Sequence, residues 1–279
     1  MSPLHAIVLG LTQGLTEFLP VSSSGHLLIV PWLFKWKDFD ESAGGLASQK
    51  AFDVALHIGT FLAALAYFRK DLVVYVRDGV KAVANRKIPP TMEGKLAWLL
   101  VVSSIPAALI GAVLEKKIDE KLGKIPLIAV SLIVFGLILG WADRLRGARR
   151  LEEYTMRDAM IIGAAQILSL NPGTSRSGIT ITAGRAVGFT RDAAARASFL
   201  MALPVTGGAI AFKMLKLAKT GIPAGLKGAL VLGILTAGIS GWAAVWGTLK
   251  LVRTKSFTPF VIYRVLAGLA VLALYGARA

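Results

Sequence analysis

The sequence contains no cysteine and few charged residues. Without cysteine, its 279 residues can form no disulfide, thiolate metal site or lipoprotein anchor. Charged residues make up only 17% of the chain, whereas soluble domains contain about 25%. Hydrophobic residues make up 55% and the mean hydropathy is +0.64. This composition argues against a disordered chain, a coiled coil or an ordinary soluble enzyme, and favours a helical protein that crosses the membrane several times.

The charge that the chain carries is strongly positive. Lys and Arg number 32 against 16 Asp and Glu, a net charge of +16. Most of the basic residues lie between apolar runs, which favours contact with anionic lipid headgroups. No strip interleaves basic and aromatic residues for stacking bases, so no nucleic-acid partner is expected. The first eleven residues contain neither Lys nor Arg, unlike a cleaved signal peptide.

Six apolar segments are long enough, or nearly so, to cross a bilayer as helices, which takes about 20 residues. Four of them carry no charge, and the other two each contain one polar residue, His57 or Arg264. The segments are residues 54–68, 96–114, 125–142, 197–212, 228–249 and 258–277.

Two further apolar segments, residues 4–34 and 158–189, are interrupted by proline, serine and glycine. Proline ends a helix, and a following Ser/Gly run is typical of the start of the next helix. Non-helical backbone at membrane depth is tolerated only where protein buries it or where it lines a wet cavity. Each segment therefore predicts a re-entrant helix–break–helix hairpin.

The two interrupted segments correspond to each other. Each is followed by three predicted spans, and each contains the pattern G-x-x-Q … S-G with the same fifteen-residue spacing from the first glycine of the pattern to the last. The matching positions are Gly10, Gln13 and Ser24-Gly25 in the first segment, and Gly163, Gln166 and Ser177-Gly178 in the second. We therefore expect a single integral membrane domain over 1–279, with an inverted repeat of halves 1–142 and 158–279 and a site between them. Coincidence of common residues is the alternative.

Basic connectors predict the orientation of the chain. The segments 69–95, 143–157, 185–196 and 250–257 would share one side and carry eighteen Lys and Arg, against twelve on the other side. The positive-inside rule places the first side in the cytoplasm. Both termini would then face outward, and the first hairpin would enter from outside.

The first hairpin carries a carboxyl, a hydroxyl cluster and an imidazole. An ionisable residue at membrane depth, such as Glu17, is a functional candidate by default, although it could simply bond to neighbouring backbone. Gln13 lies one turn earlier on the same face, as a positioning or packing residue. The run 22–26 opens a helix with hydroxyls and amides that suit an anion, or that merely cap the helix. His26 could meet Glu17 across the turn, or be structural.

The second hairpin carries Arg176 at a helix start. Its planar guanidinium matches phosphate geometry, and the alternative is an internal salt bridge, for instance with Glu17. If the hairpins meet, the cavity suits a phosphoryl group, because donors stabilise charge on its oxygens while acid–base groups move protons. The sequence contains no GxxxxGK[ST] loop, HExxH helix or Cys/His cluster. Asp53 and His57 form another polar pair, either supporting the site or lying at the interface.

Two long motifs resemble a known family. Residues 13–26 (QGLTEFLPVSSSGH) and 172–180 (PGTSRSGIT) are similar to the two signatures of the bacterial undecaprenyl-diphosphate phosphatase family of the bacitracin-resistance type. The first resembles the (E/Q)xxxE motif with its Ser-rich turn and His, and the second resembles PGxSRSxxT. The tail FTPFxxYR at 257–264 also fits, so the resemblance covers nearly the whole chain.

The resemblance implies an integral membrane hydrolase that converts undecaprenyl diphosphate to undecaprenyl phosphate and phosphate. Such an enzyme recycles the lipid carrier of peptidoglycan synthesis and confers bacitracin resistance. It implies six spans and two hairpins in the bacterial plasma (inner) membrane, with a site open to the outer face. By motif position, the catalytic residues are Glu17, Ser23, His26 and Arg176. The expected substrate-binding residues are Gln13, Ser22, Ser24, Gly25, Gly173, Thr174, Ser175, Ser177 and Thr180.

Several points stay open from the sequence. The nucleophile is Ser23, His26 or water. The family is described as helped by Mg²⁺ or Ca²⁺, but Gln13 stands where many members have Glu, which weakens a site of two carboxylates sharing a cation. A transporter or flippase of a lipid phosphate or small anion is the alternative function, because broken helices in inverted repeats also build transporters. Small residues (Gly207, Gly208, Gly238 and Gly241) could pack helices within a chain or in a homodimer.

Overall fold

The structure is a bundle of α-helices. The computed structural model describes residues 1–39, 43–84, 91–221 and 225–278, and this part of the chain contains no β-strand. The helices along it are α1 (Pro3–Phe18), α2 (Ser23–Phe34), α3 (Ala43–Tyr67), α4 (Arg69–Ala84), α5 (Met92–Leu122), α6 (Ile125–Arg144), η1 (Leu151–Glu153), α7 (Met156–Gln166), η2 (Ile167–Leu170), α8 (Arg176–Ala186), α9 (Arg191–Thr220), α10 (Lys227–Val252) and α11 (Thr258–Arg278).

The six predicted membrane spans are confirmed as long helices. Among the described residues, α3, α5, α6, α9, α10 and α11 each contain an apolar stretch of 20 to 26 residues, long enough to cross a bilayer. Large apolar side chains are exposed on them, for example Val113 at 80% and Ile239 at 73%. If these apolar side chains faced water, they would promote aggregation. In a bilayer, the acyl chains of the lipids cover them without a cost in free energy. The all-α polytopic class is therefore confirmed.

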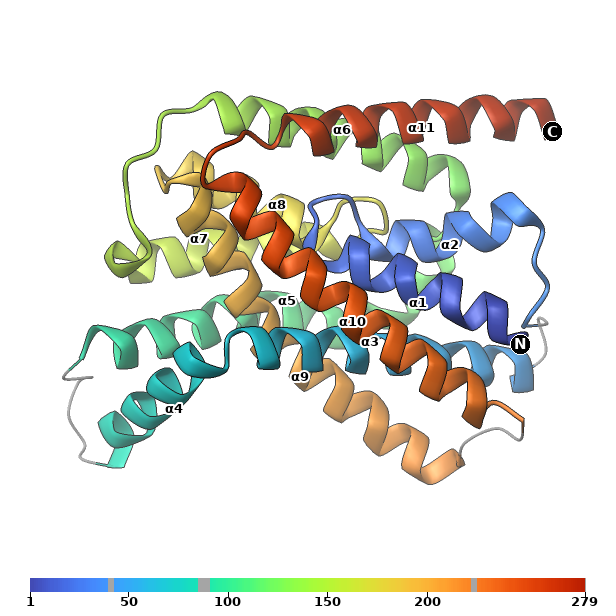
Figure 1. Cartoon of the computed structure of the whole chain (residues 1–279), viewed down its shortest axis with the longest axis horizontal. Coiled ribbons are helices and arrows are strands. Elements are labelled where there is room, and N and C mark those ends of the chain that lie inside the picture. The colour runs from blue at the N-terminus through green and yellow to red at the C-terminus, as the bar shows by residue number, and fades with distance from the viewer. Residues whose placement is uncertain (40–42, 85–90, 222–224, 279) are drawn as a thin grey trace.

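Both interrupted segments form helix–break–helix units. The chain turns at residues 19–22 between α1 and α2, and at 171–175 between η2 and α8. In Figure 1, α1 and α2 extend from the side of the chain termini to a turn in the middle of the molecule. The second turn lies beside the first, since the backbone amide of Gly173 donates to Ser22 Oγ at 3.1 Å.

One predicted connector contains a helix. Within residues 69–95, of which 85–90 lie outside the described residues, the chain forms α4. One face of α4 packs on α5, where Trp98 Nε1 donates to the carbonyl of Gly79 at 3.0 Å. Val73, Val76 and Val80 stay exposed on α4. The basic residues of this stretch lower its mean hydropathy, so the stretch is not recognised as a helix although its apolar residues recur at helical spacing.

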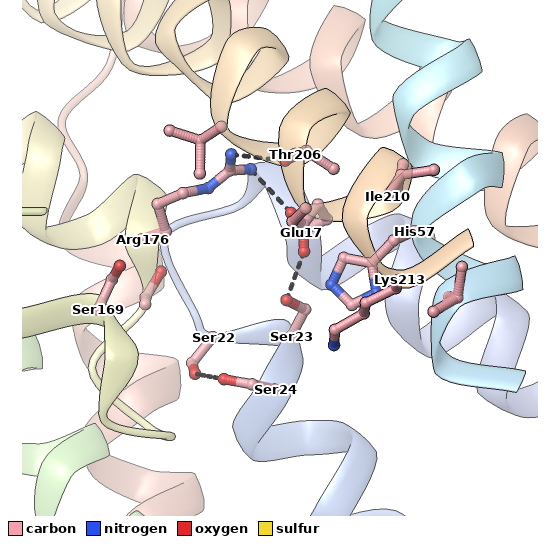
Figure 2. A pocket seen from close by; sticks show the side chains of 14 residues that line it. Glu17, Ser22, Ser23, Ser24, His57, Ser169, Arg176, Thr206, Ile210 and Lys213 are labelled. Carbon is pink, nitrogen blue, oxygen red and sulfur yellow. Dashed lines mark hydrogen bonds and ion pairs between the residues drawn. The ribbon is translucent and has the colours of Figure 1, made fainter. Parts of the chain in front are cut away.

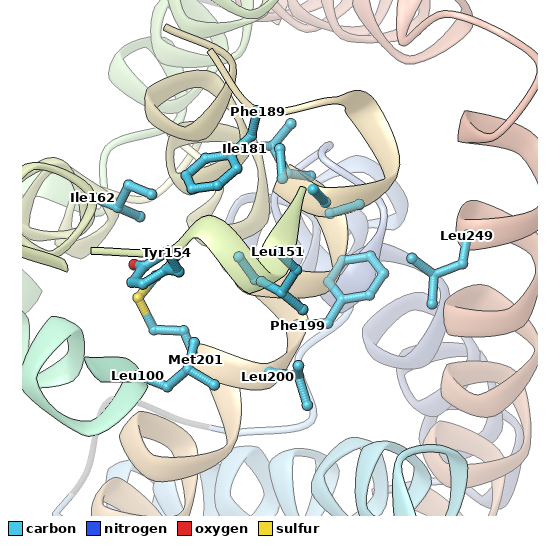
Figure 3. Packing of buried hydrophobic residues seen from close by; sticks show 14 of the residues in the cluster. Leu100, Leu151, Tyr154, Ile162, Ile181, Phe189, Phe199, Leu200, Met201 and Leu249 are labelled. Atoms are coloured by element: carbon cyan, nitrogen blue, oxygen red, sulfur yellow. The ribbon is translucent and has the colours of Figure 1, made fainter. Parts of the chain in front are cut away.

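The largest apolar core gathers around α9 and the connector between α6 and α7. Figure 3 shows Phe199 of α9 close to Leu151 of η1 and Ile181 of α8. Tyr154 lies in the same cluster and shares a hydrogen bond with Ser103 Oγ at 2.9 Å. Burial raises the pKa of Tyr154 to about 12, so the phenol stays neutral there. This packing holds α8 in place against α9.

Three of the four glycines expected to pack helices do so within one chain. A Cβ on Gly207, Gly238 or Gly241 would meet atoms of α3, whereas one on Gly208 would meet open space. The close helix packing that these glycines allow is therefore explained largely without a partner, and the homodimer remains a prediction.

Arg264 of α11 joins the two turns to the helix bundle. Its side chain is completely buried. Its guanidinium donates to the carbonyl of Pro20 at 3.0 Å in the first turn. It also donates to the carbonyls of Gly173 and Thr174 in the second turn, at 2.9 and 3.0 Å.

Arg264 also reaches α6. Its Nε donates to the carbonyl of Leu132 at 3.1 Å, and Nη2 lies 3.4 Å from the carbonyl of Ser131. A guanidinium presents five N–H donors in a planar fork. Irregular backbone at this depth leaves carbonyls that no water can satisfy, and Arg264 satisfies those of both turns at once. The polar residue that interrupts the last span is thus a structural clamp.

Replacing this clamp should destabilise the whole protein. In Arg264→Met, five buried carbonyls lose a charged donor, and hydrogen bonds to charged groups contribute roughly 1.5–3 kcal/mol each. We expect the free energy of unfolding to fall by about 3 kcal/mol or more, measured as a lower thermal midpoint in detergent. Arg278→Met is the matched control, because Arg278 lies at the exposed end of the same helix and donates to the carbonyls of Trp32 and Leu33 of α2. Equal midpoints for the two variants would contradict the clamp.

Candidate active site

A cavity of about 210 Å³ lies where the two turns meet α3 and α9. Figure 2 shows its polar side chains converging from both hairpins and from these two helices. The lining residues are Glu17, Ser22, Ser23, Ser24, Val54, His57, Ser169, Ser175, Arg176, Val205, Thr206, Ala209, Ile210 and Lys213.

An ion pair between the hairpins forms the centre of this cavity. Arg176 Nη2 donates to Glu17 Oε1 at 2.7 Å, and both side chains are largely buried. Arg176 Nη1 donates to Thr206 Oγ1 of α9 at 3.0 Å, which fixes the plane of the guanidinium. The internal salt bridge considered from the sequence is therefore present. It lies in the wall of a cavity, where an anion can compete with Glu17 for the arginine.

The second oxygen of Glu17 is bound to a hydroxyl and an amide. Ser23 Oγ donates to Glu17 Oε2 at 2.5 Å. Gln13 Nε2 donates to the same oxygen at 3.1 Å from one turn earlier on α1. Short O–H···O⁻ bonds of this kind are typical of an ionised acceptor. The carboxylate is thus in position to take the proton of Ser23.

The two turns have the same local design. Ser22 and Ser175 both have positive φ, 78° and 74°, and both cap the helix that follows. Ser22 Oγ accepts from the amides of Gly25 at 3.3 Å and Gly173 at 3.1 Å. Ser177 Oγ donates to the carbonyl of Leu19 at 3.0 Å. These bonds between the turns bring two helix N-termini to one place, where their dipoles favour an anion.

The structure brings some of the predicted site residues to the cavity wall and leaves others behind it. The residues that line the cavity are Glu17, Ser22, Ser23, Ser24, Ser175 and Arg176. Those outside the lining are Gln13, Gly25, His26, Gly173, Thr174, Ser177 and Thr180. The second set is buried and supports the first. Thr180 Oγ1, for example, donates to Ser198 Oγ at 2.7 Å and ties α8 to α9.

His26 is placed differently from the expectation that it meets Glu17. Its Nδ1 lies 2.7 Å from the carbonyl of Ser22, and its Nε2 lies 2.7 Å from the hydroxyl of Tyr263. A carbonyl can only accept, so Nδ1 carries the hydrogen and Nε2 accepts from the phenol. Both ring nitrogens are therefore occupied behind the turn. The hydrogen-bond partners of Glu17 in the described structure are Gln13, Ser23 and Arg176.

The wall that α9 contributes is not among the site residues predicted from the sequence. Thr206, Ala209, Ile210 and Lys213 all line the cavity. They follow the spacing i, i+3, i+4 and i+7, which marks one face of a helix. This spacing is visible in the sequence at the end of the predicted span 197–212, but within an apolar run it does not distinguish a cavity wall from a lipid-facing surface. Ser169 of η2 carried no signal of its own.

A family profile matches nearly the whole chain. The profile described as "Bacitracin resistance protein BacA" matches residues 6–270. The chain belongs to this family. BacA family relatives named undecaprenyl-diphosphatase include one from Pelobacter propionicus, 46% identical over 98% of this chain and 97% of its own length. Another from Geobacter sulfurreducens is 46% identical over the full length of both chains.

This BacA family site does not fit a resident Mg²⁺ or Ca²⁺. Such cations take several oxygen ligands, usually with carboxylates among them. Glu17 is the one carboxylate in the lining, and it is already paired with Arg176 beside a second cation, Lys213. Among the described residues, no three His, Asp or Glu side chains lie together as a metal site would need.

The second turn of this BacA family member should tolerate no side chain at Gly173. Gly173 has φ of +93°, and a Cβ there would lie 2.5 Å from the carbonyl oxygen of Ile128. Backbone strain and overpacking together should lower the free energy of unfolding of Gly173→Ala by at least about 2 kcal/mol. The measurement is the thermal midpoint in detergent. Gly247→Ala, where a Cβ meets nothing within 4 Å, should be neutral or slightly stabilising. A Gly173→Ala midpoint at or above that of wild type would be incompatible with this account of the turn.

Proposed function

We propose that this protein hydrolyses undecaprenyl diphosphate to undecaprenyl phosphate and phosphate. The observation that carries the proposal is the chain of contacts from Ser23 through Glu17 to Arg176 inside one cavity. A nucleophile, its base and a phosphate-binding guanidinium are the groups that phosphoryl transfer requires. The relatives at 46% identity are named for this reaction. The reaction recycles the lipid carrier for peptidoglycan synthesis and accounts for bacitracin resistance.

In the proposed reaction each group in the cavity has its own part. Arg176 exchanges its bond to Glu17 for bonds to the terminal phosphate, and Thr206 keeps the guanidinium oriented. Ser23 Oγ then attacks the terminal phosphorus while Glu17 takes its proton. The first-turn amides of α2 and α8 and the ammonium of Lys213 stabilise charge on the phosphoryl oxygens. Of the nucleophiles left open by the sequence, Ser23 is favoured over His26 because both nitrogens of His26 are occupied.

The lipid part of the substrate needs an apolar path from the cavity to the bilayer. Four apolar side chains line the cavity together with its polar groups: Val54 of α3, and Val205, Ala209 and Ile210 of α9. These side chains belong to α3 and α9, whose outer faces carry exposed apolar residues such as Leu62 and Phe212. A prenyl chain lying between these two helices would leave only the diphosphate in the polar cavity.

The transporter alternative is less favoured by the geometry. A carrier would need Arg176 to bind an anion, but it would not need a carboxylate accepting a 2.5 Å bond from a serine hydroxyl beside that anion. The relatives are named for hydrolysis.

Phosphate release should depend on the three central side chains. Glu17→Gln, Ser23→Ala and Arg176→Gln should each lower kcat/KM for a prenyl diphosphate at least about a hundredfold, or about 2.7 kcal/mol of barrier. The assay is release of phosphate by the purified protein in detergent. Glu152→Gln and Arg157→Gln, exposed residues outside the cavity, are matched controls. A well-folded wild type that releases no phosphate, with or without Mg²⁺ or Ca²⁺, would favour the transporter instead.

We further propose that the protein lies in the bacterial inner membrane with its cavity open to the outer side. In Figure 1 both termini lie at one end of the molecule, and the connector that contains η1 lies at the other. The turn between α1 and α2 contributes Ser22 to the cavity wall, and both helices lead from this turn toward the end where the termini lie. This arrangement supports a first hairpin that enters and leaves on the side of the termini. It fits the proposed inverted repeat with both termini outside. A homodimer is proposed on sequence grounds alone.

Single cysteines can test this orientation, because the chain has none of its own. Lys37 and Ala148 are exposed, Lys37 in the segment after α2 and Ala148 in the connector that contains η1, and these two segments lie at opposite ends of the bundle. We expect a membrane-impermeant maleimide to label Lys37→Cys in intact spheroplasts, and Ala148→Cys only after permeabilisation. Retained phosphatase activity controls for folding. The reverse pattern would place the cavity on the cytoplasmic side.

A further inference from the structure

One histidine lines the cavity, and it lies on a helix outside both motifs. His57 lies on α3 and is half-buried in the cavity wall. Figure 2 shows its ring beside Ser23, Glu17 and Lys213. Of the polar pair Asp53 and His57, the histidine thus places its imidazole in the cavity wall.

The hydrogen bond of His57 fixes which ring nitrogen can act. Its Nδ1 lies 2.7 Å from the backbone carbonyl of Asp53, one turn earlier on α3. Because a carbonyl only accepts, the hydrogen of the neutral ring resides on Nδ1, and Nε2 keeps a lone pair. His26 has no such lone pair to offer, since its Nε2 accepts from Tyr263. Within the described cavity, His57 is the imidazole that can take a proton.

The proposed reaction needs a second proton acceptor. In the first step, Ser23 Oγ bonds to the terminal phosphorus and the bridging P–O bond breaks. Undecaprenyl phosphate leaves as the dianion, and the proton of Ser23 passes to Glu17. Glu17 is then protonated and cannot deprotonate the water that must release the phosphoserine. Arg176 and Lys213 are cations and cannot accept a proton either.

We infer that His57 is the general base that activates this water, an inference that rests on the proposed function. Water oxygen bonds to phosphorus while its proton passes to His57 Nε2. The P–Oγ bond breaks, and Ser23 recovers its proton from Glu17. Inorganic phosphate leaves, and His57 returns its proton to solvent. Each carboxyl or imidazole thus handles one proton per cycle, and the enzyme ends as it began.

A trapped phosphoryl-enzyme separates the two steps. The probe is a prenyl diphosphate carrying ³²P in its terminal phosphate, mixed with purified protein and quenched in acid within milliseconds to seconds. In His57→Gln we expect labelled protein to accumulate to near stoichiometry, with one rapid turnover of prenyl phosphate. Steady-state phosphate release should fall at least about thirtyfold. Glu17→Gln should form no labelled protein, because its first step fails.

Two further variants provide a control and a rescue experiment. His5→Gln is the matched control, because His5 bonds to Asp38 away from the cavity, and it should neither slow release nor trap phosphate. His57→Ala should behave like His57→Gln, and added imidazole should restore release and discharge the labelled protein. That rescue would not occur if His57 only supported the fold. It also replaces the His57→Gln result should that variant be unstable.

The outcomes distinguish this inference from the function on which it rests. Unchanged phosphate release by folded His57→Gln would overturn the role of His57 and leave the hydrolase intact. Loss of the first turnover in His57→Gln would also overturn it, because the residue would then act before the phosphoryl-enzyme. Full activity of Ser23→Ala would remove the intermediate and the inference with it. A wild type that releases no phosphate would refute the hydrolase itself.

Discussion

The site depends on one buried cation that never needs to meet the substrate. Arg264 donates to carbonyls of the first turn, the second turn and α6, all from one side chain. A broken helix at membrane depth exposes backbone oxygens whose desolvation costs several kcal/mol each when they are unpaired. Two broken helices that share one guanidinium solve this problem together. The shared guanidinium of Arg264 also holds the two turns in contact. The site therefore forms at the place where the irregular backbone most needs hydrogen-bond partners.

Around this clamp, the irregular backbone becomes useful. Ser22 and Ser175 adopt positive φ, which non-glycine residues rarely do unless the surroundings enforce it. In return, α2 and α8 start at the same place, and their first residues are Ser23 and Arg176. Regular helices through this region could not present amides, hydroxyls and a guanidinium to one small volume. The hydrogen bonds of Arg264 to both turns therefore help to hold the strained backbone at Ser22 and Ser175 that brings the cavity groups together.

Much of this could be predicted from the sequence, and what could not has a physical reason. Long apolar runs revealed the six spans, and Pro/Ser/Gly interruptions revealed both breaks. Glu17 and Arg176 stood out because charges are rare at membrane depth. The roles of Arg264 and His26 were hidden, because their partners are backbone carbonyls or residues such as Tyr263, far away in sequence. No spacing rule reports a contact of that kind.

The ion pair at the centre explains how one cavity can be stable when empty and reactive when filled. A buried carboxylate and guanidinium must pair, since either alone would be strongly destabilising. A diphosphate brings its own charge and can replace Glu17 as the partner of Arg176. In the proposed reaction Glu17 would then lose the counter-charge of Arg176 and keep its bond to Ser23, so it would attract the proton of Ser23 more strongly. Substrate binding itself would therefore activate the base, so that Ser23 becomes a strong nucleophile only when a phosphate is present to receive it.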